Sequence, residues 1–164
     1  MTGKCCTFFG HRQCPIAIRP ALKCCLEDLI IHHDVTVFYV GNQGAFDSIV
    51  HSALRELAEQ YTNITYAVVL AYLPPERKDD LAQYQDYTDT MYPEGIETVP
   101  RRFAIDWRNR WMLKQADYVV TYITHSWGGA AKFAEKAVKS GKQVINLGND
   151  EKQRQKLAVP PTFL

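Results

Sequence analysis

Apolar residues occur in this chain in two arrangements that alternate along its length. Short, nearly continuous apolar runs rich in β-branched and aromatic residues, such as VTVFYVG, are typical of buried strands. The run ITYAVVLAYL is followed directly by Pro74 and Pro75, which end a strand. The pattern predicts strands over residues 5–10, 35–41, 64–73, 117–123 and 143–148.

Between these runs, apolar residues recur at the three- and four-residue spacing of one helix face. The clearest helix is predicted over residues 47–61, where the recurring positions are Val50, Ala53, Leu54, Leu57, Ala58 and Tyr61. Further helices are predicted over residues 15–33, 101–115 and 129–140. Residues 76–100 are polar and tyrosine-rich, and we expect them to be irregular apart from a short helix around residues 79–87.

Strands that alternate with helices predict an α/β domain whose parallel strands are joined by helical crossovers. Because each apolar run is nearly continuous, both faces of the sheet should be covered. We therefore expect a three-layer, Rossmann-like fold with a mainly parallel sheet of about five strands flanked by helices. The 164 residues fit a single domain, with a core over residues 4–148 and a tail over 149–164 that packs back on it.

The overall charge adds a constraint on partners. Nineteen Lys and Arg residues against eighteen Asp and Glu residues leave a net charge of +1. Because this balance favours neither nucleic acid nor an anionic membrane, we do not expect either as a partner. The N-terminal residues lack a signal-peptide pattern, and the longest apolar stretch, residues 67–73, is too short to cross a bilayer. We therefore expect a cytoplasmic protein without membrane contact.

Five cysteines lie within the first 25 residues: Cys5, Cys6, Cys14, Cys24 and Cys25. Their number is odd and no CxxC pair is present, which argues against a disulfide framework or a zinc site. We expect them to act as small buried apolar residues, and we expect neither a metal nor a cofactor.

Three loops that follow predicted strands contain glycine. They are Gly10-His11-Arg12, then Gly41-Asn42-Gln43-Gly44 leading to Asp47, and then His125-Ser126-Trp127-Gly128-Gly129. Glycine lets backbone N–H groups approach an anion, and the following helix directs its positive dipole end there. A tight turn explains any one loop, but three loops at the carboxyl edge of one sheet favour a phosphate site. Neither GxGxxG nor GxxxxGK[ST] occurs.

The polar side chains near these loops have more than one interpretation. Arg12 could pair with a phosphate or remain solvated, and His11 could form a cap, form a hydrogen bond or titrate. Asp47 is either a favourable first-turn carboxylate or an acceptor for ribose hydroxyls. Arg108 lies beside the aromatic stripe of its helix, which favours a half-buried site residue over a solvated one.

Four stretches of the sequence resemble the SLOG superfamily, namely FFGHR, YVGNQGAFD, RNRWMLKQADYVVTY and SWGGAAKFAE. That superfamily unites the DNA-processing DprA/Smf proteins with the LOG "lysine decarboxylase-like" proteins. The resemblance covers residues 4–148 and is closest to the YpsA-like branch of bacteria and prophages. It implies the same Rossmann-like fold, and the dimers usual among LOG proteins imply a homodimer.

The LOG patterns RKxxMxxxAD and PGGxGTxxE imply roles for individual residues. The first matches Arg108, Met112, Ala116 and Asp117, and the second matches Gly128, Gly129 and Glu135. By resemblance, Arg108 and Glu135 are catalytic and the glycine loop holds phosphate, although from the residues alone Glu135 is a surface carboxylate. The sequence departs from these patterns at Asn109, Trp127, Ala131 and Lys132.

Three functions remain open on this basis. Because the departures fall on the phosphate loop, we favour a module that binds a nucleotide or nucleotide-derived small molecule, as a ligand sensor or sequestering protein. The alternative is a LOG-type phosphoribohydrolase of nucleoside 5′-monophosphates, in which Glu135 stabilises the oxocarbenium-like centre or activates water. A third, weaker hypothesis is DprA-like handling of single-stranded DNA.

Overall fold

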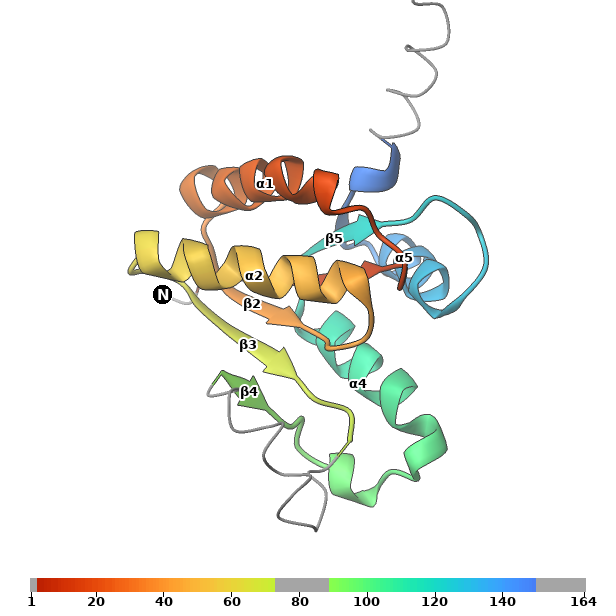
Figure 1. Ribbon diagram of the computed structural model, residues 1–164. Helices are drawn as coiled ribbons and strands as arrows, with labels where there is room; N and C mark the ends of the chain where they lie inside the picture. The colour runs from red at the N-terminus through yellow and green to blue at the C-terminus, as the bar shows by residue number, and fades with distance from the viewer. Residues whose placement is uncertain (1–2, 73–88, 150–164) are drawn as a thin grey trace, which may run out of the picture.

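A computed structural model describes residues 3–72 and 89–149, and six strands within them form one sheet (Figure 1). The strand order is β4-β3-β2-β1-β5-β6, and every neighbouring pair is parallel. The strands are β1 (Lys4–Gly10), β2 (Val35–Val40), β3 (Thr65–Val69), β4 (Thr90–Met91), β5 (Tyr118–Tyr122) and β6 (Gln143–Asn146). The sheet confirms the predicted α/β class and contains one strand more than expected.

The additional strand, β4, lies in the segment that we predicted to be irregular. It pairs with β3, where Val68 and Val69 face Thr90 and Met91. Two residues are too few to produce a recognisable apolar pattern, so the sequence carried no sign of this strand. The short helix expected around residues 79–87 and the tail from residue 150 onward lie outside the described residues.

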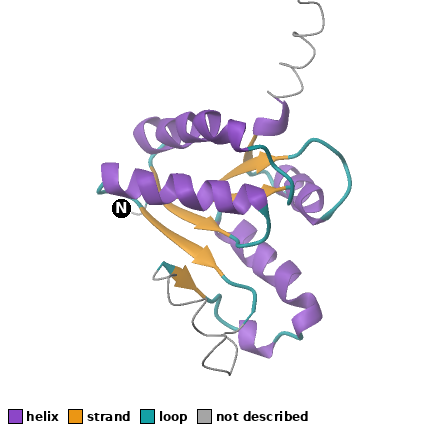
Figure 2. Cartoon of the chain, in the orientation of Figure 1, coloured by secondary structure: helices purple, strands orange, loops and turns teal. Residues whose placement is uncertain are grey.

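Helices cover both faces of the sheet (Figure 2). The first layer consists of α1 (Arg19–His32) and α2 (Ala45–Gln60), and the second layer consists of α4 (Arg101–Gln115) and α5 (Gly129–Lys139). Single 3-10 turns, Ile16–Ile18 and Ile96–Thr98, precede α1 and α4. The first layer buries the larger core, in which Leu54 and Leu57 are fully enclosed. The second layer packs Met112 and Phe133 on the opposite face of the sheet.

The path of the chain explains why the helices form two layers. From β1 the chain passes to β2, β3 and β4 in one direction, and it then returns to β5 on the other side of β1. Right-handed crossovers place the helices of the outward and returning paths on opposite faces. β1 and β5 are therefore neighbours whose following loops lead to different layers. The crevice outside the carboxyl ends of such a pair is where sheets of this kind bind ligands.

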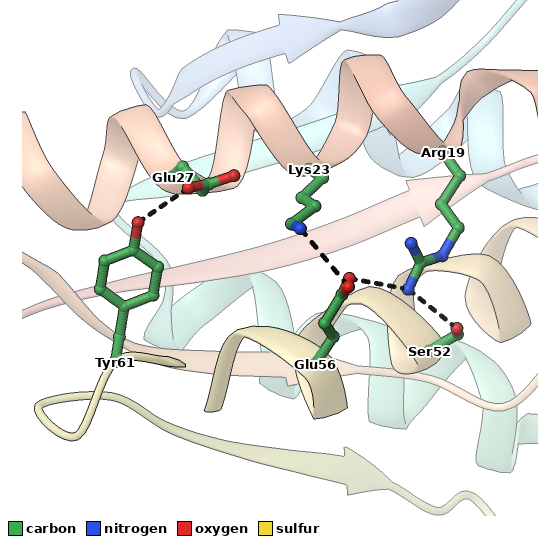
Figure 3. Close-up of polar contacts among 6 residues, drawn as sticks. All are labelled: Arg19, Lys23, Glu27, Ser52, Glu56 and Tyr61. Carbon is green, nitrogen blue, oxygen red and sulfur yellow. Dashed lines mark hydrogen bonds and ion pairs between the residues drawn. The ribbon is translucent and has the colours of Figure 1, made fainter. Parts of the chain in front are cut away.

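Polar contacts join α1 to α2 on the outer side of the first layer (Figure 3). The Arg19 guanidinium and the Lys23 ammonium lie 3.2 and 3.4 Å from the Glu56 carboxylate. The Tyr61 hydroxyl donates to Glu27 at 2.8 Å. Partly exposed pairs of this kind add little to stability.

The cysteines divide between buried and exposed positions. Cys5 and Cys6 are buried in β1, as expected, whereas Cys24 is exposed on α1. Burial, and then the nearby Asp117 carboxylate, raise the pKa of Cys5 to about 12, so its thiol stays protonated near neutral pH. Over the described ranges, no helix is long and apolar enough to cross a membrane, and no three His, Cys, Asp or Glu side chains gather as a metal site.

Candidate functional site

A cavity of about 600 Å³ opens where β1 and β5 end side by side. Its walls come from the ends of these two strands, the loops after them, and the first turns of α2 and α5. A further wall is one face of α4, formed by Ile105, Arg108, Asn109 and Met112 at helical spacing. A cavity of this size can accept a small organic ligand or one nucleotide unit.

Three aromatic rings are stacked at one side of the cavity. The His11 ring, after β1, lies 3.6 Å from the His125 ring, after β5, with an interplanar angle of 11°. The Trp127 ring continues the stack at 3.6 Å from His125 and 18°. Trp127 is 69% exposed, whereas His11 is buried. The stack therefore ends in an exposed indole at the mouth of the cavity.

A hydrogen bond fixes the protonation state of the innermost ring. The backbone N–H of Thr124 donates to Nε2 of His11 at 3.0 Å, so that nitrogen carries no proton. Burial, and then the neighbouring His125, lower the pKa of His11. The neutral ring is therefore favoured at physiological pH. This contact ties the loop after β5 to the loop after β1.

The innermost charged groups of the cavity are Arg108 and Asp47. Arg108 is 1% exposed, and it donates from Nη1 to the carbonyl of Val69 at 2.8 Å and from Nε to Asn109 at 2.9 Å. Asp47 accepts from the backbone N–H of Gln43 at 2.9 Å. Burial raises the pKa of Asp47 to about 6, although the Gln43 hydrogen bond and the Arg108 charge oppose the shift. Burial also lowers the pKa of Arg108.

The glycines of the loop after β2 support these groups from behind, and Gln43 is the residue of this loop that lines the cavity. A side chain at Gly41 would lie 2.9 Å from the Asp47 carboxylate and 3.1 Å from the Arg108 guanidinium. Asn42 accepts a hydrogen bond from Arg108 at 3.3 Å. Gly44 has φ +97°, and a Cβ there would lie 2.6 Å from the Cα of Arg12. This loop therefore holds Arg12, Asp47 and Arg108 in place.

The glycines of the loop after β5 have free space around them, whereas those of the loop after β2 are closely packed. Gly128 also has φ +97°, yet a Cβ on Gly128 or Gly129 would meet nothing within 4 Å. The base of this loop is held by Asn146 of β6, whose amide accepts from the N–H of Ile123 at 2.9 Å and donates to its carbonyl at 3.0 Å. The backbone at the start of α5 thus faces an accessible space from a fixed base.

Glu135 and Ser126 lie elsewhere. Both line a second hollow of about 430 Å³ beside β6, together with Ala131, Ala134 and Val138. These α5 residues share one helix face, whereas the α5 residues that line the first cavity are Gly129 and Ala130 of its first turn. Glu135 is exposed and forms an ion pair with Lys139 at 2.9 Å. The structure therefore does not bring Glu135 and Arg108 into one cavity.

Most of the other predicted residues lie at this edge of the sheet, but Gly41, Asn42 and Gly44 do not line the cavity. Those that line the cavity are Gly10, His11, Arg12, Asp47, Arg108, Trp127, Gly128 and Gly129. The cavity also has polar side chains to which we assigned no role from the sequence, namely Gln13, Gln43, Asn109, Thr124 and His125. For Asn109 the sequence did carry a sign. It lies four residues after Ile105 and three before Met112, which places all three on one helix face. Nothing in the sequence indicated that His125 would stack on His11.

Charge is distributed unequally between the two helix layers. Helix α4 carries five basic residues against one acidic residue, a formal charge of +4. Helix α5 carries three basic residues against one acidic residue, a formal charge of +2. In the first layer, α1 is formally neutral and α2 carries −2. The net charge of +1 therefore conceals a basic second layer next to the cavity.

No protein-family model and no curated protein sequence matches this chain. Solved structures do match, and two of them are named here. DNA processing protein A (DprA) from Streptococcus pneumoniae matches with a TM-score of 0.62 and 16% identity over 88% of this chain and 50% of that one. DprA from Helicobacter pylori matches with a TM-score of 0.59 and 15% identity over 88% of this chain and 65% of that one.

The fold of this chain is similar to that of DprA. The chain spans half of one DprA structure and 65% of the other. The likeness supports the Rossmann-like fold that we expected from the sequence. Both structures are of DprA, so the likeness gives no evidence on the YpsA-like branch or the LOG enzymes.

The comparison contradicts the expectation that nucleic acid is not a partner. The Helicobacter pylori structure is described in terms of a unique single-stranded DNA binding mode of DprA, and it shares the fold of this chain. The expectation failed because it rested on a charge summed over the whole chain. The sum hides the basic second layer that the structure reveals.

Proposed function

We propose that this chain binds single-stranded DNA and places one nucleotide of the strand in the cavity between β1 and β5. The observation that carries the proposal is the exposed Trp127 ring at the outer end of the stack with His125 and His11. Proteins that bind single strands use exposed aromatic rings on which bases stack, next to basic surface that follows the phosphates. The DprA fold of the chain agrees with this function.

The cavity offers groups for the phosphate and the sugar as well as the base. Arg12 is exposed at the rim, and the open backbone of Gly128 and Gly129 begins α5. A phosphate there would meet backbone N–H groups and the positive end of the α5 dipole. Asn109 and Gln13 are polar groups within reach of a sugar or a base edge. The basic second layer would attract the rest of the strand.

A free nucleotide or nucleotide-derived compound is the second candidate, because a cavity of about 600 Å³ is large enough for a nucleotide. The same stack and rim would hold it. The hydrolase hypothesis gains no support, because Glu135 lies outside this cavity and pairs with Lys139.

The test is a fluorescence-anisotropy titration with a labelled thymidylate oligonucleotide at several salt concentrations. We expect binding that weakens as salt increases, and a loss of about tenfold for Trp127→Ala, because stacking on one ring contributes about 1–3 kcal/mol. Trp127→Phe should retain most of the affinity. Ile31→Ala, which removes another exposed apolar side chain from the first layer, serves as the control.

Two outcomes would decide against the proposal. Absence of binding by the wild-type chain would reject it, and so would equal affinity of Trp127→Ala. Melting temperatures measured with mononucleotides test the second candidate separately. A ligand at 100 times its Kd adds about 2.7 kcal/mol of stability and therefore raises the melting temperature. Stabilisation by a mononucleotide without oligonucleotide binding would favour the free nucleotide.

A further inference from the structure

We propose that the bound strand continues from the cavity onto a second nucleotide subsite at the start of α4. This subsite consists of Arg101, Arg102 and Phe103, which we call the α4 entry turn. The inference rests on the proposed function and extends it, because it assigns the path of the strand and a footprint longer than one nucleotide. It comes from three features of the entry turn: its position, its positive charge and its exposed ring.

The entry turn lies directly beyond the cavity wall. Ile105 and Arg108 line the cavity from α4, and Arg101 precedes Ile105 by one helical turn, about 6 Å along the axis. Figure 1 shows the N-terminal end of α4 beyond the arrowhead of β3, on the carboxyl side of the sheet. All three residues of the entry turn are exposed, and the helix becomes buried at Ala104. A strand that leaves the cavity along α4 reaches this turn next.

The positive charges of the entry turn are not neutralised by carboxylates in the described part of the chain. Elsewhere in the second layer, Asp106 pairs with Arg110 and Lys132, each at 2.8 Å. No ion pair among residues 3–72 and 89–149 includes Arg101 or Arg102. Two adjacent arginines without a carboxylate partner in these ranges are suited to the phosphates of a strand.

Aromatic rings accompany both arginines. The Arg102 guanidinium lies 4.8 Å from the centre of the Phe103 ring, and the Arg101 guanidinium lies 4.0 Å from that of Tyr72. Phe103 is 51% exposed, so one face of its ring is open to solvent. An exposed ring next to arginines that can contact phosphates is a stacking position for a base. The entry turn thus repeats the combination of ring and cation found at Trp127 and Arg12.

Charge favours nucleic acid over a protein as the occupant. A protein partner would require a patch of about 800 Å² with an apolar centre. Three residues, two of them charged, do not provide such a centre. A polyanion with flat bases matches both the charge and the ring.

The experiment measures affinity against oligonucleotide length. Labelled thymidylates of about three and about twelve nucleotides are titrated into the wild-type chain, Phe103→Ala, the double variant Arg101→Ala/Arg102→Ala, and Lys114→Ala. Lys114 is the control because it is an exposed cation at the opposite end of the same helix. Near-ultraviolet circular dichroism and melting temperature establish that each variant is folded.

For the wild type we expect a tighter complex with the longer strand. Phe103→Ala should weaken the long complex about tenfold and leave the short one unchanged. The double variant should lower the slope of log affinity against log salt by about 1.4 for the long strand, about 0.7 for each lost phosphate contact. Lys114→Ala should behave as the wild type.

The outcomes separate the two proposals. If the wild type binds neither length, the proposed function itself fails. If it binds both, and the entry-turn variants retain wild-type affinity for the long strand, only the second subsite is rejected. Equal losses for the short and long strands in a folded Phe103→Ala would also reject the subsite, because the effect would then lie in the cavity.

Discussion

The two helix layers of this protein share one sheet and differ in almost every other respect. The first layer encloses the larger core, pairs Arg19 and Lys23 with Glu56, and carries little net charge. The second layer has a smaller core and a large positive charge, and its helices form two walls of the cavity. The comparison indicates that the first layer mainly stabilises the sheet, whereas the second layer mainly serves binding.

The largest expected effect tests the stabilising role of the first layer. Leu54 of α2 is fully buried, and Leu54→Ala should lower the free energy of unfolding by about 2–5 kcal/mol through lost burial and a new void. Urea denaturation measures this loss. Where the variant remains folded at low temperature, its oligonucleotide affinity should equal that of the wild type. A variant that is folded and yet does not bind would break the comparison.

The next effect concerns Asp47, the carboxylate that the first layer contributes to the cavity. Its pKa is about 6 in the folded chain against 3.8 ordinarily, so folding favours the protonated form. The resulting stability is fully present below about pH 4 and is lost as the pH rises through about 6, a change of about 3 kcal/mol. Asp47→Asn should remove this pH dependence.

Urea denaturation of the wild type and of Asp47→Asn between pH 4 and pH 7 measures the difference. Groups that titrate in both proteins cancel, so the difference isolates Asp47. Parallel stability curves for the two proteins would show that this carboxylate has an ordinary pKa.

The smallest effect compares two glycines with the same backbone angle. Gly44 and Gly128 both have φ +97°, so alanine at either position should cost about 1–3 kcal/mol in backbone strain. Gly44→Ala should cost more, because its Cβ would also lie 2.6 Å from the Cα of Arg12, whereas Gly128 faces open space. Melting temperatures measure both costs. A larger loss for Gly128→Ala would contradict the described openness of its loop.

The sequence predicted the elements whose own residues carry a pattern. The run at residues 35–41 and the periodicity at 47–61 correspond to β2 (Val35–Val40) and α2 (Ala45–Gln60) within two residues. Strand β4 exists because β3 offers it a partner, and two residues carry no pattern of their own. Local patterns therefore predicted the fold well, and features that depend on pairing were missed.

The candidate site divides in a similar way. The cavity position follows from the topology, and Arg12, Asp47 and Arg108 lie there because their loops and helix face converge. The position of Glu135 could not be inferred from a motif match, because a few residues along a helix change the face on which a side chain lies. The basic residues of 101–115 are visible in the sequence, but the sequence does not show that this helix and the basic helix at 129–139 cover the same face of the sheet.

One hydrogen bond described above bears on how the chain folds. Thr124 and His11, which it joins, are 113 positions apart in the sequence. Contacts over such distances form slowly, because a long loop must close before the contact adds stability. During synthesis, the strands from β1 to β3 can pair while the wall contributed by β5 has still to be translated. The cavity is therefore completed late, and ligand binding reports that the distant halves of the chain have come together.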